Sequence, residues 1–206
     1  MDLDIGYVIL AGGKSKRLGR NKIKEVIGDM TLLDRVITVL AAFKGEIIIV
    51  TAENSDVPDA FHYPKIEIVH DLYPDKGMIG GILTGLSLSK HYYNLVVGCD
   101  MPFLNSGLLR YMINITEGND LIAYRVKTNF EPLHAIYSKN CLPVLEEIMQ
   151  KNLRIIELIE RVKVRYLSLD EINRYDPRNL SFFNVNTEAD LSIANKIAAQ
   201  EVSAIE

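Results

Sequence analysis

The chain has 206 residues, a length that suits a single domain with one sizeable core. Its 23 basic and 27 acidic residues give a net charge of −4, which disfavours sequence-independent nucleic-acid binding because that function needs a broad basic surface. No apolar run approaches the ~20 residues of a membrane span, and the acidic N-terminus is unlike a signal peptide. Two distant cysteines fit neither a zinc finger nor a disulfide scaffold. We therefore expect a cytoplasmic protein that binds neither nucleic acid nor membranes.

Short apolar runs alternate with helical patterns along the chain. Strands are predicted at residues 7–10, 47–50, 66–69, 95–97, 121–124, 133–137 and 162–167. Helices are predicted at residues 77–89, 105–116, 142–150 and 153–160. Two more helices are predicted to begin after an N-cap at Thr31 and after a capping box formed by Thr187 and Asp190. This order favours an α/β fold, a three-layer α/β/α sandwich with a Rossmann-like, mostly parallel sheet. The closely spaced strands between residues 120 and 169 predict an antiparallel addition at one edge.

Sheets of this kind bind ligands at the carboxyl ends of their strands, and the first such loop is rich in glycine and cations. Residues 10–22 read LAGGKSKRLGRNK, with three glycines and five cations in thirteen residues. The loop fits neither of two common phosphate-binding motifs. A Walker A motif needs its first glycine at position 8, where this chain has Val8, and the dinucleotide-binding motif G-x-G-x-x-G needs a glycine where this chain has Lys14. The alternatives are a solvated basic loop and an anion site, and the position after the first strand favours anion binding.

Two acidic residues follow later strands of the predicted sheet. Asp100 stands in the string C-D-M-P-F and could either bind Mg²⁺ or cap the next helix. Asp71 precedes a helix with glycines at 77, 80, 81 and 85, which permit either tight helix packing or close approach to a bound base.

The second half of the chain offers weaker candidates. Alternation places Asn184 and Asn186 on one face of a short predicted strand, from which both could reach the crevice near Asp100. The alternative is that they satisfy nearby backbone groups at the start of the last helix. Glu131 could orient an acceptor or a main-chain turn, and His134 lies in an apolar strand pattern that gives no reason for acid–base work.

Taken together, these strings resemble the nucleotidyltransferases related to molybdenum cofactor guanylyltransferase. The residues that carry the resemblance are the opening L-A-G-G-x-S-x-R-L-G-x-x-K, C-D-M-P-F at 99–103, E-P-L-x-A-x-Y at 131–137 and F-x-N-V-N-T at 182–187. The resemblance covers residues 7 to about 197 and implies the fold of the nucleotide-diphospho-sugar transferases. It also implies one domain over 1–206, with a nucleotide-binding half at 5–117 and an acceptor-binding half at 118–200.

The resemblance assigns roles to individual positions. The implied nucleotide-binding residues are Leu10, Ala11, Gly12, Gly13, Lys14, Arg17, Lys22, Asp71, Gly77, Gly80, Gly81 and Asp100. Of these, it implies that Arg17, Lys22 and Asp100 are catalytic and that Asp100 binds Mg²⁺. It also favours a place for Asn186, and more weakly Asn184, near the metal and phosphates, with Glu131 near the acceptor.

The activity that the resemblance implies is transfer of GMP from GTP to molybdenum-bound molybdopterin with release of pyrophosphate, by in-line attack at the α-phosphate. The string L-A-G-G favours GTP over CTP, because related cytidylyltransferases more often read L-A-A-G. Three alternatives stay open: a molybdopterin cytidylyltransferase, another nucleotidyltransferase for a small phosphorylated acceptor, and a non-catalytic nucleotide-binding chaperone. Molybdoenzymes or their chaperones are the protein partners to expect.

Overall fold

The structure is a computed structural model that describes residues 4–12, 22–53, 55, 63–127 and 129–203. Its centre is one sheet of eight strands: β1 (Ile5–Leu10), β4 (Ile47–Thr51), β5 (Ile66–His70), β6 (Tyr93–Gly98), β7 (Leu121–Val126), β8 (Asn129–Phe130), β9 (His134–Ser138) and β10 (Val164–Leu167). The strands lie in the order β10-β7-β9-β6-β1-β4-β5, and β8 pairs with β7. A separate two-stranded ribbon consists of β2 (Val26–Ile27) and β3 (Met30–Thr31).

The sheet is mostly parallel, as predicted. Strand β1 pairs in parallel with β4 and β6, and β4 pairs in parallel with β5. Two strands run antiparallel to their neighbours: β9, which lies between β6 and β7 rather than at the edge, and the two-residue β8, which pairs with β7. Because β9 opposes both of its neighbours, β7 and β10 run in the same direction as β1. The strands of the second half therefore extend the sheet on one side, and β7 and β10 keep the direction of β1 although β9 runs against it.

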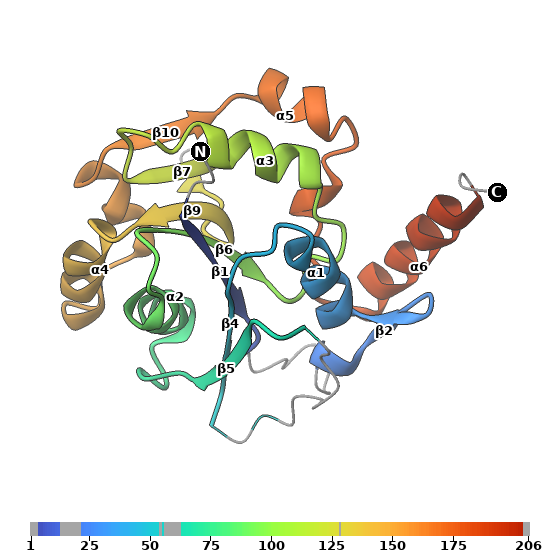
Figure 1. Ribbon diagram of the computed structural model, residues 1–206, viewed down its shortest axis with the longest axis horizontal. Helices are drawn as coiled ribbons and strands as arrows, with labels where there is room; N and C mark the ends of the chain where they lie inside the picture. The colour runs from blue at the N-terminus through green and yellow to red at the C-terminus, as the bar shows by residue number, and fades with distance from the viewer. Residues whose placement is uncertain (1–3, 13–21, 54, 56–62, 128, 204–206) are drawn as a thin grey trace.

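Helices cover both faces of the sheet, which gives the predicted three layers (Figure 1). One face carries α1 (Leu32–Ala41), α3 (Ser106–Asn114) and α5 (Leu169–Tyr175). The other carries α2 (Gly77–Leu88), α4 (Cys141–Gln150) and the 3₁₀ helix η2 (Ile155–Glu160). Consecutive residues of a strand serve opposite layers: Ile9 packs into the first and Val8 into the second.

The last helix, α6 (Glu188–Ser203), lies apart from these layers beside the β2–β3 ribbon (Figure 1). A small apolar cluster joins the two, with Ile27 from the ribbon, Ala194 from α6 and Phe103 from the segment after β6. Two short 3₁₀ helices, η1 (Lys22–Lys24) and η3 (Leu180–Phe182), complete the described structure. Among the described residues, no helix combines the length and the apolar character needed to cross a membrane.

Local signals account for most of the helix boundaries. The Thr31 hydroxyl accepts a hydrogen bond from the Asp34 amide at 3.0 Å, and the Asp34 carboxylate accepts one from the Thr31 amide at 3.4 Å. These two bonds form a capping box for α1. The predicted capping box at Thr187 and Asp190 is confirmed in the same way. The structure corrects two predictions: the helix expected over 153–160 is a 3₁₀ helix, and residues 183–186 form no strand.

The parallel strands end at one edge of the sheet, and their register brings the loops that follow them together. Leu10 is paired with both Val50 and Gly98, so β1, β4 and β6 end level with one another. Gly12 and Asp100 follow two of these strands directly. This is the edge at which the sequence predicts ligand binding.

Candidate active site

Asp100 is fixed at the carboxyl end of β6 by its neighbours on both sides. Cys99 and Met101 are buried, and the Met101 amide donates to the Gly98 carbonyl at 3.3 Å. A Cβ atom at Gly98 would lie 2.5 Å from Asp100 Oδ1, so glycine at that position leaves room for the carboxylate. The Asp100 side chain is 20% exposed, which leaves it accessible to a ligand.

Lys22 belongs to η1, the short turn that follows the glycine-rich loop. The buried side chain of Ile23 anchors this turn in the core that packs below α1. The Lys22 ammonium lies 3.2 Å from Asp100 Oδ2 and is 17% exposed. A half-buried ion pair therefore joins the first loop to the end of β6.

Asn186 lies next to the same ammonium. Its Oδ1 atom accepts a hydrogen bond from Lys22 Nζ at 2.6 Å, while its backbone amide donates to Asp190 at the start of α6. The Val185 amide donates to the Asp100 carbonyl at 2.9 Å, which fixes this segment to the end of β6. The structure thus brings Asn186 to the Lys22–Asp100 pair, although the segment is not a strand, and its role near a metal and phosphates stays a prediction.

Asn184 does not share this arrangement, because its side-chain amide donates to the Phe182 carbonyl at 3.2 Å. That contact matches the alternative in which the side chain satisfies a nearby backbone group. Its proposed place near the metal stays a prediction.

Glu131 lies within electrostatic range of Asp100. Burial, reinforced by the Asp100 charge, raises the pKa of its carboxyl group above the usual value. Glu131 Oε1 accepts a hydrogen bond from the Leu133 amide at 3.1 Å, so the side chain orders a main-chain turn. This was one of its two expected roles, and contact with an acceptor stays a prediction.

Asp71 organises the connection between β5 and α2. Its Oδ1 atom accepts from the Tyr73 amide and from the Thr84 hydroxyl, each at 2.9 Å. Gly80 and Gly81 are buried in α2: an added Cβ would lie 2.7 Å from the Tyr73 carbonyl oxygen or 3.2 Å from Leu10. These two glycines therefore serve tight packing, and base contact by Asp71, Gly80 or Gly81 stays a prediction.

Gly77 differs from these two, because it is exposed at the start of α2 with φ of +59° and open space around it. Leu10 packs against Gly81 and Ala11 is buried, whereas Gly12 is exposed at the end of β1. Three of the predicted phosphate-binding residues, Gly13, Lys14 and Arg17, lie outside the described residues.

Two further side chains are accounted for by packing. Burial raises the pKa of the Cys99 thiol to about 12, as expected for an ordinary buried cysteine. His134 is fully buried, packs against Phe182 in a tilted arrangement with 4.6 Å between ring centroids, and has a pKa lowered to about 4 by burial. The sequence favours a satisfied core or surface histidine rather than a base; the ring is in the core, but neither of its buried nitrogens has a hydrogen-bond partner among the described residues.

The donor set at Asp100 suits a hard cation. Within the part of the chain that the structure describes, no group of three or more His, Cys, Asp or Glu side chains converges on a metal site. Instead, one carboxylate oxygen and one amide oxygen already converge on a cation, the Lys22 ammonium. Mg²⁺ is commonly bound by one or two protein oxygens and completes its shell with phosphates and water, so Asp100 and Asn186 fit it.

The model of the MobA-like NTP transferase domain matches residues 7–164, which is most of the chain. The chain belongs to the MobA-like NTP transferase family. Among curated relatives of this family member, a probable molybdenum cofactor guanylyltransferase from Pelotomaculum thermopropionicum is 34% identical over 93% of this chain and 92% of its own length. A molybdenum cofactor guanylyltransferase from Desulfosudis oleivorans is 30% identical over 91% of this chain and 92% of its own length.

Solved structures of MobA-like and related proteins share the fold. Molybdopterin-guanine dinucleotide biosynthesis protein A from Archaeoglobus fulgidus superposes with a TM-score of 0.79 at 24% identity, over 95% of this chain and 99% of its own. 2-C-methyl-D-erythritol 4-phosphate cytidylyltransferase from Thermus thermophilus superposes with a TM-score of 0.70 at 11% identity, over 93% of this chain and 98% of its own. These likenesses confirm the predicted nucleotidyltransferase fold.

Sequence reasoning missed two contributors to the site of this MobA-like protein. Gly98 is required beside the Asp100 carboxylate, and the only signal was a glycine two positions before an acidic strand end. The role of Val185 was also missed, because a backbone hydrogen bond to Asp100 leaves no trace in residue type.

Proposed function

We propose that this chain is a molybdenum cofactor guanylyltransferase that transfers GMP from GTP to molybdenum-bound molybdopterin and releases pyrophosphate. The observation that carries the proposal is the convergence of Lys22, Asp100 and Asn186 at the carboxyl edge of the sheet. These residues come from three separate segments, each of which matches a motif of the family. The names of the full-length relatives supply the substrate class.

The chemistry required of the protein is positioning and charge stabilisation. A terminal phosphate of the acceptor would attack the α-phosphate of GTP, forming the new phosphoanhydride bond as the bond to the pyrophosphate leaving group breaks. The Lys22 ammonium would neutralise phosphate oxygens, and Arg17 is the second cation proposed for this work. A phosphate nucleophile is already ionised near neutral pH, so the reaction needs no strong general base.

Asp100, with Asn186 beside it, would hold Mg²⁺. When bound, the ion would supply positive charge that offsets the negative charge developing on the pyrophosphate leaving group. Lys22 must then exchange its contacts with Asp100 and Asn186 for contacts with phosphate. The positive charge of Lys22 at this edge of the sheet would help to attract two anionic substrates to one place on a protein of net charge −4.

Nucleotide titrations provide the first test. Calorimetric titration with GTP, CTP, ATP and UTP, each with Mg²⁺, should show selective GTP binding that weakens in Lys22→Ala. The matched control is Lys24→Ala, which removes an exposed charge from the same 3₁₀ helix. Selective binding of CTP would assign the chain to the cytidylyltransferases and overturn the choice of base.

Pyrophosphate release tests the catalytic step. With molybdenum-bound molybdopterin as acceptor, Asp100→Ala should abolish Mg²⁺-dependent release of pyrophosphate. Unchanged turnover would show that Asp100 is not a ligand of the metal. Tight GTP binding without product would favour the alternative of a nucleotide-binding chaperone. A cytoplasmic location and onward transfer of the product to molybdoenzymes or their chaperones are part of the same proposal.

A further inference from the structure

Thr84 is a fully buried threonine in α2, and the other buried positions of this helix are glycines and aliphatic residues. A threonine inside a helix usually points to solvent or bonds a carbonyl of its own helix one turn back. The Thr84 hydroxyl instead donates to Asp71 Oδ1 at 2.9 Å and accepts from the Leu72 amide at 3.0 Å. Its bonds therefore join α2 to the segment that follows β5, and helix formation alone does not account for them.

Asp71 is fixed by its backbone and by one oxygen of its side chain. Its amide donates to the Thr51 carbonyl at 2.8 Å, at the end of β4. Its Oδ1 atom accepts from the Tyr73 amide and from the Thr84 hydroxyl, and these two bonds occupy both lone pairs of that atom. Within the part of the chain that the structure describes, Oδ2 has no hydrogen bond or ion pair. The half-buried carboxylate thus has one oxygen committed to the fold and one that is left to a ligand.

The register of the sheet places Asp71 level with Gly12. Leu10 pairs with Val50 and Val50 pairs with Val69, so Gly12 and Asp71 each lie two residues beyond the same row. Neighbouring strands are ~4.8 Å apart, so the two residues are separated by two strand spacings, or ~10 Å, along the carboxyl edge. A nucleotide whose phosphates lie at the glycine-rich loop would therefore bring its nucleoside to Asp71.

Tight packing makes the Thr84 hydroxyl a rigid support. A Cβ atom at Gly80 would lie 2.7 Å from the Tyr73 carbonyl oxygen, and one at Gly81 would lie 3.2 Å from the Leu10 side chain. Helix α2 is therefore pressed both on the end of β1 and on the segment after β5. Because the helix cannot shift against either, Thr84 holds the Asp71 carboxylate in one orientation before any ligand arrives.

We propose that Thr84 is a positioning residue for nucleotide binding, whose hydroxyl holds Asp71 so that Oδ2 accepts one hydrogen bond from the nucleoside. The donor is one O–H group of the ribose or one N–H group of the base. With both lone pairs of Oδ1 occupied, Asp71 cannot pair with two adjacent N–H donors of a guanine at once. This inference rests on the proposed function, in which the chain binds GTP, and adds to it Thr84 and the limit to a single donor.

The test uses the full chain and calorimetric titration with GTP and Mg²⁺ in the absence of acceptor. Thr84→Val keeps the shape of the side chain without its hydroxyl and should weaken GTP binding by about fivefold or more, because Asp71 loses its orientation. Thr84→Ser keeps the hydroxyl and should bind GTP as wild type does. The matched control is Thr116→Val, since Thr116 is also buried and its hydroxyl donates to the Ile113 carbonyl at 2.9 Å, after α3. Wild-type affinity in Thr84→Val would overturn the inference.

Asp71→Asn keeps the test decisive if loss of the Thr84 hydroxyl unfolds the protein. The amide oxygen of the variant can still accept from the Tyr73 amide and the Thr84 hydroxyl, whereas an NH₂ group replaces Oδ2 and cannot accept a hydrogen bond. GTP binding should weaken by about tenfold or more, because a charge-assisted hydrogen bond is lost. Equal affinity of Asp71→Asn and wild type for GTP would also overturn the inference.

Four analogues, each without one donor of GTP, identify the contacted group. They are 2′-deoxy-GTP, 3′-deoxy-GTP, ITP, which lacks the exocyclic amino group, and 1-methyl-GTP, which lacks the ring N–H. The analogue without the contacted donor should bind wild type weakly, and neither Thr84→Val nor Asp71→Asn should weaken it further. If Thr84→Val weakens GTP and all four analogues by the same factor, its effect is a general change of structure and the inference is wrong.

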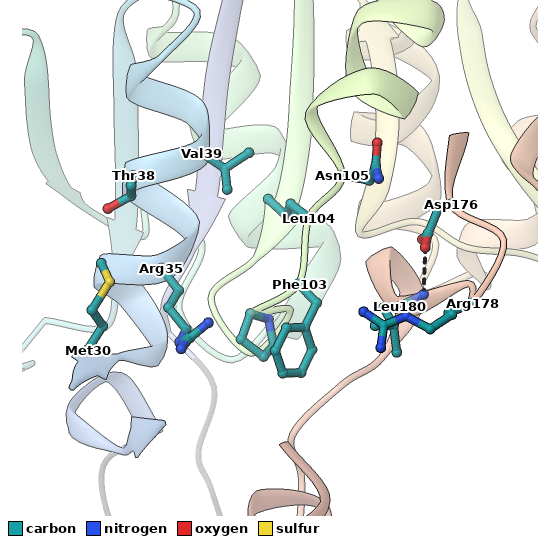
Figure 2. Close-up of a pocket in the computed structure, with 11 residues that line it drawn as sticks. Met30, Arg35, Thr38, Val39, Phe103, Leu104, Asn105, Asp176, Arg178 and Leu180 are labelled. Carbon is teal, nitrogen blue, oxygen red and sulfur yellow. Dashed lines mark hydrogen bonds between the residues drawn. The ribbon is translucent and has the colours of Figure 1, made fainter. Parts of the chain in front are cut away.

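A cavity beside α1, on the opposite face of the sheet from α2, is the competing location for a nucleotide. It lies between α1, the segment that follows β6 and the turn that follows α5, and Figure 2 shows Thr38 in its wall. Thr38→Trp would fill this cavity from an exposed helix position and should leave GTP binding unchanged. Loss of GTP binding in Thr38→Trp but not in Thr84→Val would place the nucleotide there and overturn the inference alone. A wild-type chain that binds no nucleotide would overturn the proposed function and the inference together.

Discussion

The Lys22 ammonium lies 3.2 Å from the Asp100 carboxylate, although 78 positions separate the two residues. The same ammonium lies 2.6 Å from Asn186 Oδ1, across 164 positions. A carboxylate and an amide oxygen are also acceptable ligands for Mg²⁺. Lys22 therefore contacts the same two oxygens that are proposed to bind Mg²⁺, and the proposed metal site implies competition between the ammonium and the ion.

This competition predicts that removal of the lysine charge strengthens metal binding. Lys22→Met should bind Mn²⁺ without nucleotide about tenfold or more tightly than wild type, since a unit charge at ~4 Å opposes a cation by ~1 kcal/mol in bulk water and by ~4 kcal/mol near a protein surface. Electron paramagnetic resonance of free Mn²⁺ measures this affinity without any turnover. Lys24→Met removes the same charge from an exposed neighbouring position. Equal effects of the two variants would indicate a general change in charge and contradict direct competition.

The two asparagines of the C-terminal segment should differ in their effect on catalysis. Asn186→Ala removes the amide oxygen proposed to hold Mg²⁺ beside Asp100, so we expect kcat for nucleotidyl transfer to fall by about tenfold or more. Asn184→Ala removes only a contact with the Phe182 carbonyl and should change kcat much less. Steady-state kinetics of both variants, with GTP varied, provide the comparison. A fall in kcat in Asn184→Ala but not in Asn186→Ala would show that Asn184, and not Asn186, contributes to catalysis.

The fold could be predicted wherever a segment is long and strongly patterned. The apolar run of β4 is sufficient to predict that strand, and the Thr31 cap is sufficient to predict the start of α1. The β2–β3 ribbon could not be predicted, because two-residue strands are too short to show a period. Helix α5 also escaped prediction, since Ile172 is its only buried residue and no apolar face is visible in the sequence.

The candidate site could be predicted in part. Asp100 follows a strand and Lys22 follows the glycine-rich loop, so strand-end reasoning places both at one edge of the sheet. The contact of Asn186 with Lys22 depends on the return of the C-terminal segment to β6, which is a tertiary event. For the glycines of α2, the sequence could not decide between tight helix packing and close approach to a ligand. The structure shows that Gly80 and Gly81 are packed.

Packing of α2 on the sheet predicts a steric penalty at Gly85. An added Cβ would lie 2.3 Å from Val8 Cγ1, in the fully buried centre of the sheet. Gly85→Ala should lower the free energy of unfolding by ~1–3 kcal/mol, as overpacking does in other cores. Denaturant unfolding measures the change, with exposed Ser87→Ala in the same helix as control. In a Val8→Ala background the penalty should shrink, and an unchanged penalty would place its cause elsewhere.

Buried His134 predicts a loss of stability in mild acid. Its pKa is lowered from 6.5 to about 4 in the folded protein, chiefly by burial, so the unfolded chain binds the additional proton first as pH falls. Its contribution is complete above pH 6.5 and is lost progressively down to about pH 4, by ~3 kcal/mol in all. The groups around it are the Phe182 ring, which cannot ionise, and the Asp176 charge, which only partly offsets the effect of burial. His134→Leu should flatten the dependence of the unfolding free energy on pH between 4 and 6.5. If the slope in that interval stays the same in the variant, other groups carry it and His134 does not.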